Sequence, residues 1–139
     1  MNEIVNQNRR GILKAAGAAG LMLAGGVHAH AAAATATARK RYAVVGVGSR
    51  SRMYTDAATG KFRDTSEIVA VCDTNAGRVE RAVKAISKTG ASQPRPYLAA
   101  DFDKMLRETK PEFVIVTTKD ATHDDYIVRA LDAGCDVIT

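Results

Sequence analysis

The stretch RYAVVGVGSRSRMY, residues 41–54, decides the fold class of this chain. A continuous apolar run ends in two glycines and passes into a segment, rich in serine and arginine, that can start a helix. An uninterrupted apolar run of this kind is typical of a strand that is buried on both faces, as in a parallel sheet. The stretch therefore predicts a strand, a tight glycine turn and a helix in direct succession.

Strand-like and helix-like segments alternate from this stretch to the end of the chain. The predicted strands are residues 42–48, 67–73, 95–99, 112–118 and 135–139, and a helical pattern lies between each pair. From apolar spacing we expect the first and last helices to face the sheet with Met53, Ala57 and Ala58, and with Ile127, Ala130 and Leu131. Alternation of this kind favours an α/β fold, a doubly wound, Rossmann-like parallel sheet with strand order 3-2-1-4-5.

The glycine turn after the first predicted strand is the candidate ligand site. Gly46 permits a tight turn, and Gly48 lets a pyrophosphate approach the backbone. The turn continues through Ser49, and the unpaired N–H groups of Arg50 and Ser51 at the helix start favour an anion. Ser51 stands where a third glycine is usual, so we expect the helix to pack more loosely on the strand. The alternative is a tight strand-to-helix turn that binds no ligand.

Asp73 closes the second predicted strand, 27 residues after Gly46, where the usual spacing is about 20 residues. A carboxylate there can accept hydrogen bonds from both ribose hydroxyls of an adenosine and repels a 2′-phosphate, which favours NAD over NADP. Arg50 and Arg78 are near enough in sequence to hold a phosphate instead, so NADP is not excluded. The alternative role for Asp73 is to cap the following helix.

Residues 1–38 are predicted to be a Tat-type signal peptide and an Ala-rich linker. Arg9 and Arg10 are followed by an uncharged, weakly apolar run that ends in the small-residue pattern of residues 29–31. Residues 8–14, NRRGILK, resemble the twin-arginine signal S/T-R-R-x-F-L-K. We therefore expect the Tat translocation machinery to export the protein to the periplasm or the cell exterior. The alternative is a short N-terminal anchor or a disordered extension.

The charge pattern argues against a nucleic-acid partner. The formal net charge is +5, but the clustered basic residues lie in the leader and directly before the first strand, and no basic stripe with interleaved aromatics is present. Cys72 and Cys135 are 63 residues apart and have no CxxC motif or histidine partner nearby. We therefore expect no metal site and two small buried cysteines.

Residues 41–139 resemble the Gfo/Idh/MocA family of NAD(P)-dependent oxidoreductases. The resemblance rests on VVGVGSRSRMY, AVCDTNAGR, YLAADFDKML and, most specifically, VIVTTKDATHDDYIVRALDAGCDVIT. In the last segment the family has T-P-x-x-x-H; here Thr118 and His123 match, and Lys119 replaces the proline. The resemblance implies that Thr117, Thr118 and His123 lie beside the nicotinamide and its ribose.

The family's E-K-P motif would follow Thr139. Its lysine is implied as the proton donor or acceptor at the substrate, so no catalytic residue is assigned within this chain. The resemblance also implies a second, mostly antiparallel domain that supplies the substrate pocket and an interface for a homo-oligomer. We therefore expect that the chain is incomplete and that residues 39–139 are its dinucleotide-binding domain. We expect this domain to be inactive without the second domain.

The resemblance implies hydride transfer between NAD(P) and a hydroxyl carbon of a sugar or polyol. Some exported relatives instead use tightly held NAD to cleave glycosides through transient oxidation, and the residues of this domain do not separate the two reactions. A third alternative is a non-catalytic module that only binds a nucleotide.

Overall fold

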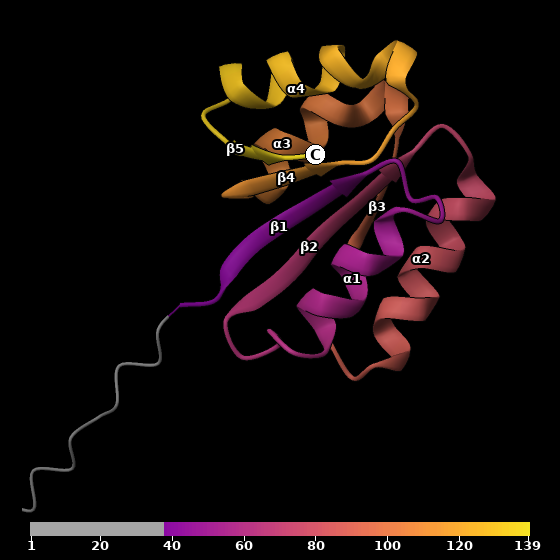
Figure 1. Cartoon of the computed structure of the whole chain (residues 1–139), viewed down its shortest axis with the longest axis vertical. Coiled ribbons are helices and arrows are strands. Elements are labelled where there is room, and N and C mark those ends of the chain that lie inside the picture. Colours follow the sequence, from indigo (N-terminus) through magenta and orange to yellow (C-terminus); the bar gives the residue numbers. More distant parts are fainter. Residues whose placement is uncertain (1–37) are drawn as a thin grey trace, which may run out of the picture. The chain divides into compact units, whose positions relative to one another are not determined.

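The computed structural model describes residues 38–139, which contain one five-stranded parallel sheet (Figure 1). Its strands are β1 (Lys40–Val45), β2 (Ser66–Asp73), β3 (Arg95–Leu98), β4 (Phe113–Val116) and β5 (Asp136–Ile138). The order is β3-β2-β1-β4-β5, and every neighbouring pair is parallel. The predicted α/β fold and strand order are both confirmed.

Four helices cover the two faces of the sheet. Figure 1 shows α1 (Ser51–Thr59) and α2 (Ala76–Lys88) on one face, and α3 (Phe102–Thr109) and α4 (His123–Asp132) on the other. Short 3-10 turns, η1 (Ala99–Asp101) and η2 (Asp120–Thr122), lead into α3 and α4. The chain therefore crosses to the opposite face after β3, which is the doubly wound arrangement.

Each face of the sheet has its own apolar core, because successive strand residues point to opposite sides. In β1, Val44 joins the core under α1 and α2, whereas Ala43 and Val45 join the core under α3 and α4. All three are at most 1% exposed. This two-sided burial explains why the strands read as continuous apolar runs instead of alternating patterns.

Two helix positions differ from the sequence prediction. Met53 is 65% exposed and Leu131 is 54% exposed, although both were expected to face the sheet. Tyr54, which follows Met53, packs against the core under α1 and α2, and Tyr126 and Ala130 of α4 are buried in the core on the other face. Each helix thus places a tyrosine ring on its inward face, and the packing of that ring removes apolar area from water.

The amino ends of the strands are closed by polar and aromatic contacts. Lys40 Nζ lies 2.8 Å from Glu112 Oε2, and the Arg41 guanidinium donates to the carbonyl of Thr109 at the end of α3. Beside them, the rings of Tyr42 and Phe113 stack with their centroids 5.1 Å apart. These contacts join β1 to β4 and to the end of α3.

Residues 1–37, which hold nearly all of the predicted signal peptide and linker, lie outside the described residues. Within residues 38–139, no helix has the length and apolarity needed to cross a membrane.

Candidate functional site

The candidate site lies at the carboxyl ends of β1, β2 and β4, which are neighbours in the sheet. From β1 the chain turns to the helices of one face, and from β4 it turns to a helix of the other face. A doubly wound sheet has its crevice at this point, where the strand order reverses. All of the predicted site residues follow or end one of these three strands.

Gly46 is required by the protein's own packing. Its φ is +85°, and a Cβ added to it would lie 2.7 Å from the carbonyl carbon and oxygen of Thr117 and from the nitrogen of Thr118. The N–H of Gly46 donates to the carbonyl of Cys72 at 2.8 Å. A glycine at position 46 is therefore needed both for the backbone angle of the turn and for the close approach of the loop that follows β4.

Gly48 is not required in that way. A Cβ added to it would have no heavy atom within 4 Å other than those of residues 47–49. The open space beside this backbone is the feature that the approach of a pyrophosphate needs. The residues present therefore fit a dinucleotide at this turn.

The peptide N–H groups around Gly48 form the second part of this fit. The N–H groups of Val47, Ser49, Arg50 and Ser51 have no hydrogen-bond partner within residues 38–139. Helix α1 has no acidic residue in its first turn and no side-chain cap, so nothing offsets the positive end of its dipole. An anion at this turn would meet unpaired donors and a favourable field.

Ser51, which stands where a glycine is usual, is buried and hydrogen-bonded inside the protein. The residue is only 3% exposed, and its hydroxyl donates to the carbonyl of Gly48 at 2.8 Å. The buried hydroxyl therefore has a partner. A serine in the first turn of a helix, three residues after a glycine, was the sequence signal for this bond. The expected looser packing of α1 on β1 stays a prediction.

Asp73 ends β2 and is 5% exposed. Its Oδ1 accepts the N–H of Asn75 at 2.9 Å and the hydroxyl of Thr74 at 3.4 Å. Its Oδ2 has no hydrogen-bond partner in the described part of the chain. The cap of α2 is Asn75, whose Oδ1 accepts the N–H of Arg78 at 3.1 Å. One carboxylate oxygen thus holds the turn, and the other is open to a ligand.

The side chains of Arg50 and Arg78 are exposed, and neither forms an ion pair with another described residue. Their charges are therefore not neutralised by the domain itself. Both remain candidates for a phosphate contact, as the sequence predicted.

The loop after β4 is bound to the glycine turn. The hydroxyl of Thr117 donates to the carbonyl of Gly46 at 2.7 Å, and the N–H of Thr117 donates to the carbonyl of Val45 at 2.9 Å. The Thr117 hydroxyl therefore has a partner inside the protein. Its part in fixing the turn was not visible in the sequence, because the two residues are 71 positions apart.

Thr118 and His123 are also brought together, with Thr118 Oγ1 3.2 Å from His123 Nδ1. His123 is the first residue of α4, and its Nε2 has no partner within residues 38–139. Between them, Lys119 has φ −69° and ψ 147°. This φ is the one that a proline ring imposes, so lysine replaces the family's proline without altering the backbone that proline favours.

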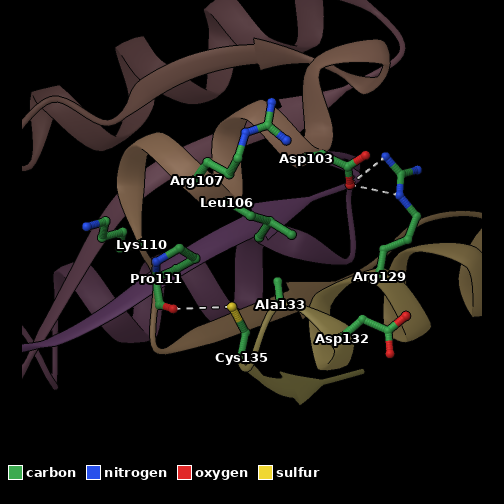
Figure 2. A pocket seen from close by; sticks show the side chains of 9 residues that line it. All are labelled: Asp103, Leu106, Arg107, Lys110, Pro111, Arg129, Asp132, Ala133 and Cys135. Atoms are coloured by element: carbon green, nitrogen blue, oxygen red, sulfur yellow. Dashed lines mark hydrogen bonds and ion pairs between the residues drawn. The ribbon is translucent and has the colours of Figure 1, made fainter.

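A separate hollow of about 620 Å³ lies between α3 and α4 (Figure 2). Arg129 on its wall pairs with Asp103, and Cys135 Sγ donates to the carbonyl of Pro111 at 3.3 Å. None of the residues that line this hollow belongs to the predicted site. Two of its charged side chains, Arg129 and Asp103, join the two helices through their ion pair.

The strand order and the glycine turn at its reversal define an α/β domain of the dinucleotide-binding class. Residues 40–139 match the model of the Gfo/Idh/MocA oxidoreductase family, described as having a NAD-binding Rossmann fold. The chain therefore belongs to this family.

Three relatives illustrate the match. An α-N-acetylgalactosaminidase of Tannerella forsythia is 30% identical over 92 residues, which are 65% of this chain and 19% of the relative. The WlbA dehydrogenase of Bordetella pertussis, solved with NADH and UDP-GlcNAcA, is 28% identical with a TM-score of 0.58, over 71% of this chain and 28% of its own. The scyllo-inositol dehydrogenase of Lactobacillus casei, solved with NAD(H) and scyllo-inositol, shares the fold at 19% identity and a TM-score of 0.59, over 71% of this chain and 27% of its own. The chain thus spans less than a third of each relative.

Proposed function

We propose that residues 39–139 bind NAD(H) at the carboxyl end of the sheet. The observation that carries this proposal is the open space beside Gly48, together with the four unpaired N–H groups at the start of α1. Gly46, Gly48, Ser49, Arg50 and Ser51 would hold the pyrophosphate. The position is the one where sheets of this topology bind dinucleotides.

The adenosine ribose would be held at the end of β2. The free Oδ2 of Asp73 can accept a ribose hydroxyl while Oδ1 continues to hold the Asn75 turn. A carboxylate here disfavours a 2′-phosphate, so the proposal is a preference for NAD over NADP. Arg78 is the exposed cation closest in sequence to this end of the ligand, and it is the residue that would weaken the preference.

The nicotinamide end would lie beside the loop after β4. Thr118 and His123 are proposed to contact the nicotinamide or its ribose, and the free Nε2 of His123 is available for that contact. Thr117 is proposed to act through the glycine turn, to which its hydroxyl is already bonded.

For the whole protein we propose an oxidoreductase that acts at a hydroxyl carbon of a sugar or polyol. NAD, when bound, supplies the hydride acceptor. The residues of this domain bind and orient the dinucleotide. Support for this substrate class comes from the solved relatives, whose complexes contain a nucleotide sugar and an inositol.

A NAD-dependent glycosidase is the second candidate. The observation that favours it is the relative from Tannerella forsythia, which is named as an α-N-acetylgalactosaminidase. The two functions differ in the fate of the cofactor, because a glycosidase of this type returns NAD to its starting state at the end of each turnover.

We also propose export through the Tat pathway, supported by Arg9, Arg10 and the small-residue pattern at residues 29–31. Replacing both arginines by lysine keeps the charge but removes the paired guanidinium groups. We expect the variant to stay in the cytoplasm, whereas the wild type loses its leader and reaches the cell exterior or periplasm. Cell fractionation and the intact mass of the native protein test this proposal.

The central experiment is a titration of the full-length protein with NADH, followed by assays with a panel of polyols, sugars and nitrophenyl glycosides. We expect saturable NADH binding. NADH formation in step with the loss of a polyol or sugar would support the oxidoreductase, and glycoside cleavage without net NADH formation would support the glycosidase. Absence of NADH binding by the folded protein would overturn the proposed function.

A further inference from the structure

Ser51 stands where the dinucleotide-binding motif usually has its third glycine, and its hydroxyl has a defined partner. We propose that Ser51 is a positioning residue for the cofactor's pyrophosphate. Its hydroxyl holds the Gly48 carbonyl on the buried side of the turn, so that the N–H of Ser49 is directed toward the anion. This inference rests on the proposed function of the turn as a dinucleotide site.

The bond has only one arrangement of donor and acceptor. The Gly48 carbonyl can only accept, so the Ser51 hydroxyl donates across the 2.8 Å between them. Ser51 is 3% exposed, so this carbonyl is directed toward a buried side chain. The bond is part-buried, with the donor on its buried side.

The geometry of the peptide unit carries this orientation to the next residue. The Gly48–Ser49 peptide is planar, and the chain has no cis peptide within residues 38–139, so its C=O and N–H point in opposite directions. When the carbonyl is held on the buried side, the Ser49 N–H is directed away from it. That N–H has no partner among the described residues, which leaves it available to a ligand.

The alternative orientation would work against an anion. A carbonyl oxygen turned to the ligand side would present partial negative charge to a pyrophosphate, where the N–H presents partial positive charge. The Ser51 hydroxyl therefore affects the sign of the field at the turn, beyond its contribution to packing.

Gly48 needs such a restraint more than Gly46 does. Gly46 is confined by the Thr117 and Thr118 backbone and by the hydroxyl of Thr117. Around the Cβ position of Gly48 there is open space, so neighbouring atoms do not confine it there. A glycine has a wide choice of backbone angles. The N–H of Gly48 donates to the carbonyl of Gly46 at 2.9 Å, which restrains the peptide before Gly48, and the Ser51 hydroxyl restrains the peptide after it.

The test replaces Ser51 by alanine and by glycine and titrates each variant with ADP-ribose, which contains the pyrophosphate, and with adenosine, which does not. We expect both variants to bind ADP-ribose about fivefold more weakly than the wild type, the effect of one net hydrogen bond. We expect adenosine affinity to be unchanged. The ratio of the two affinities within one variant is independent of how much of the sample is folded.

Ser66→Ala is the matched control. Ser66 is also a buried serine, and its hydroxyl donates to the carbonyls of Ala58 at 3.0 Å and Phe62 at 2.6 Å, at the opposite end of the sheet. We expect this variant to lose stability in urea while the ratio of ADP-ribose to adenosine affinity stays at its wild-type value.

Wild-type affinity for ADP-ribose in either Ser51 variant would overturn the inference and leave the proposed function standing. Equal weakening of ADP-ribose and adenosine would also overturn it, because the effect would then be a general structural one. A wild-type protein that binds neither ligand would overturn the proposed function and this inference together.

Discussion

The two ends of the sheet use their polar groups in opposite ways. At the amino end, Lys40 pairs with Glu112, and the Arg41 guanidinium donates to a helix carbonyl. At the carboxyl end, four peptide N–H groups and one oxygen of Asp73 have no partner within the described residues. The first end joins elements of the domain to one another, whereas the second keeps donors and an acceptor free for a ligand.

The distribution of ion pairs follows the same division. Among residues 38–139, the ion pairs lie at the amino end of the sheet, along α2, along α4 and between α3 and α4. None of them involves Arg50, Arg78 or Asp73. Charges at the candidate site are thus available for recognition, and the difference between the ends can be tested residue by residue.

The largest expected effect is on folding, from Gly46→Ala. The substitution places a methyl group 2.7 Å from the backbone of Thr117 and Thr118 at a φ of +85°. We expect a loss of about 3 kcal/mol or more in the free energy of unfolding, measured in urea. Gly48→Ala is the matched control, and its stability should change by less than about 0.5 kcal/mol, since no atom lies within 4 Å of the new methyl group. Equal stability of both variants would contradict the close approach of the two loops.

The next effect is on binding, from Gly48→Val. The larger side chain occupies the space that the pyrophosphate needs, so NADH affinity should fall about tenfold or more, equivalent to about 1.4 kcal/mol. The urea midpoint should stay close to that of the wild type because the site is open. Normal affinity in the folded variant would remove the glycine turn from the proposed binding site.

A smaller effect is expected on cofactor preference, from Asp73→Ala. Without the carboxylate, a 2′-phosphate is no longer repelled, and the ratio of NADH to NADPH affinity should fall about fivefold. Stability should also fall by about 1 kcal/mol, because the Asn75 N–H loses its acceptor. Titrations with both cofactors measure the ratio. An unchanged ratio with reduced stability would limit Asp73 to holding the turn.

The smallest effect is expected at the amino end, where the groups are exposed to water. A hydrogen bond from Lys40 lowers the pKa of Glu112 below its ordinary value, and the same pair raises the pKa of Lys40. A carboxyl with a lowered folded-state pKa stabilises the fold above its unfolded pKa, and that contribution is lost as the pH falls through the folded value. Urea midpoints measured from neutral to acidic pH should show a slight decline that is smaller in Glu112→Gln, with NADH affinity at neutral pH unchanged. A pH profile that is identical in both proteins would contradict this assignment.

The fold could be predicted from the sequence because its signals are local. Continuous apolar runs identify β1, β2 and β4, and turn residues such as the glycines after β1 separate the strands from the helices. Met53 was misplaced because the spacing of small apolar residues does not show which face of α1 a neighbouring tyrosine occupies. Tertiary packing decided that rotation.

The candidate site could be located from the sequence but only partly explained by it. Gly46 and Gly48 look equivalent in the motif, yet one is required by a neighbouring loop and the other only by the space it leaves. The backbone angles of Lys119 could not be predicted from the sequence either, since lysine does not impose a φ as proline does. Such differences depend on contacts between residues far apart in the chain.

The bond between Thr117 and Gly46 also has a consequence for the order of events during synthesis. The two residues are 71 positions apart, so the glycine turn is complete only after β4 and the first residue beyond it have left the ribosome. Until then, β1 cannot pair with β4, and the glycine turn lacks the hydrogen bond from Thr117. The nucleotide site is therefore assembled late, as a by-product of closing the centre of the sheet, and a nascent chain that stops short of Thr117 would carry the whole motif without its conformation.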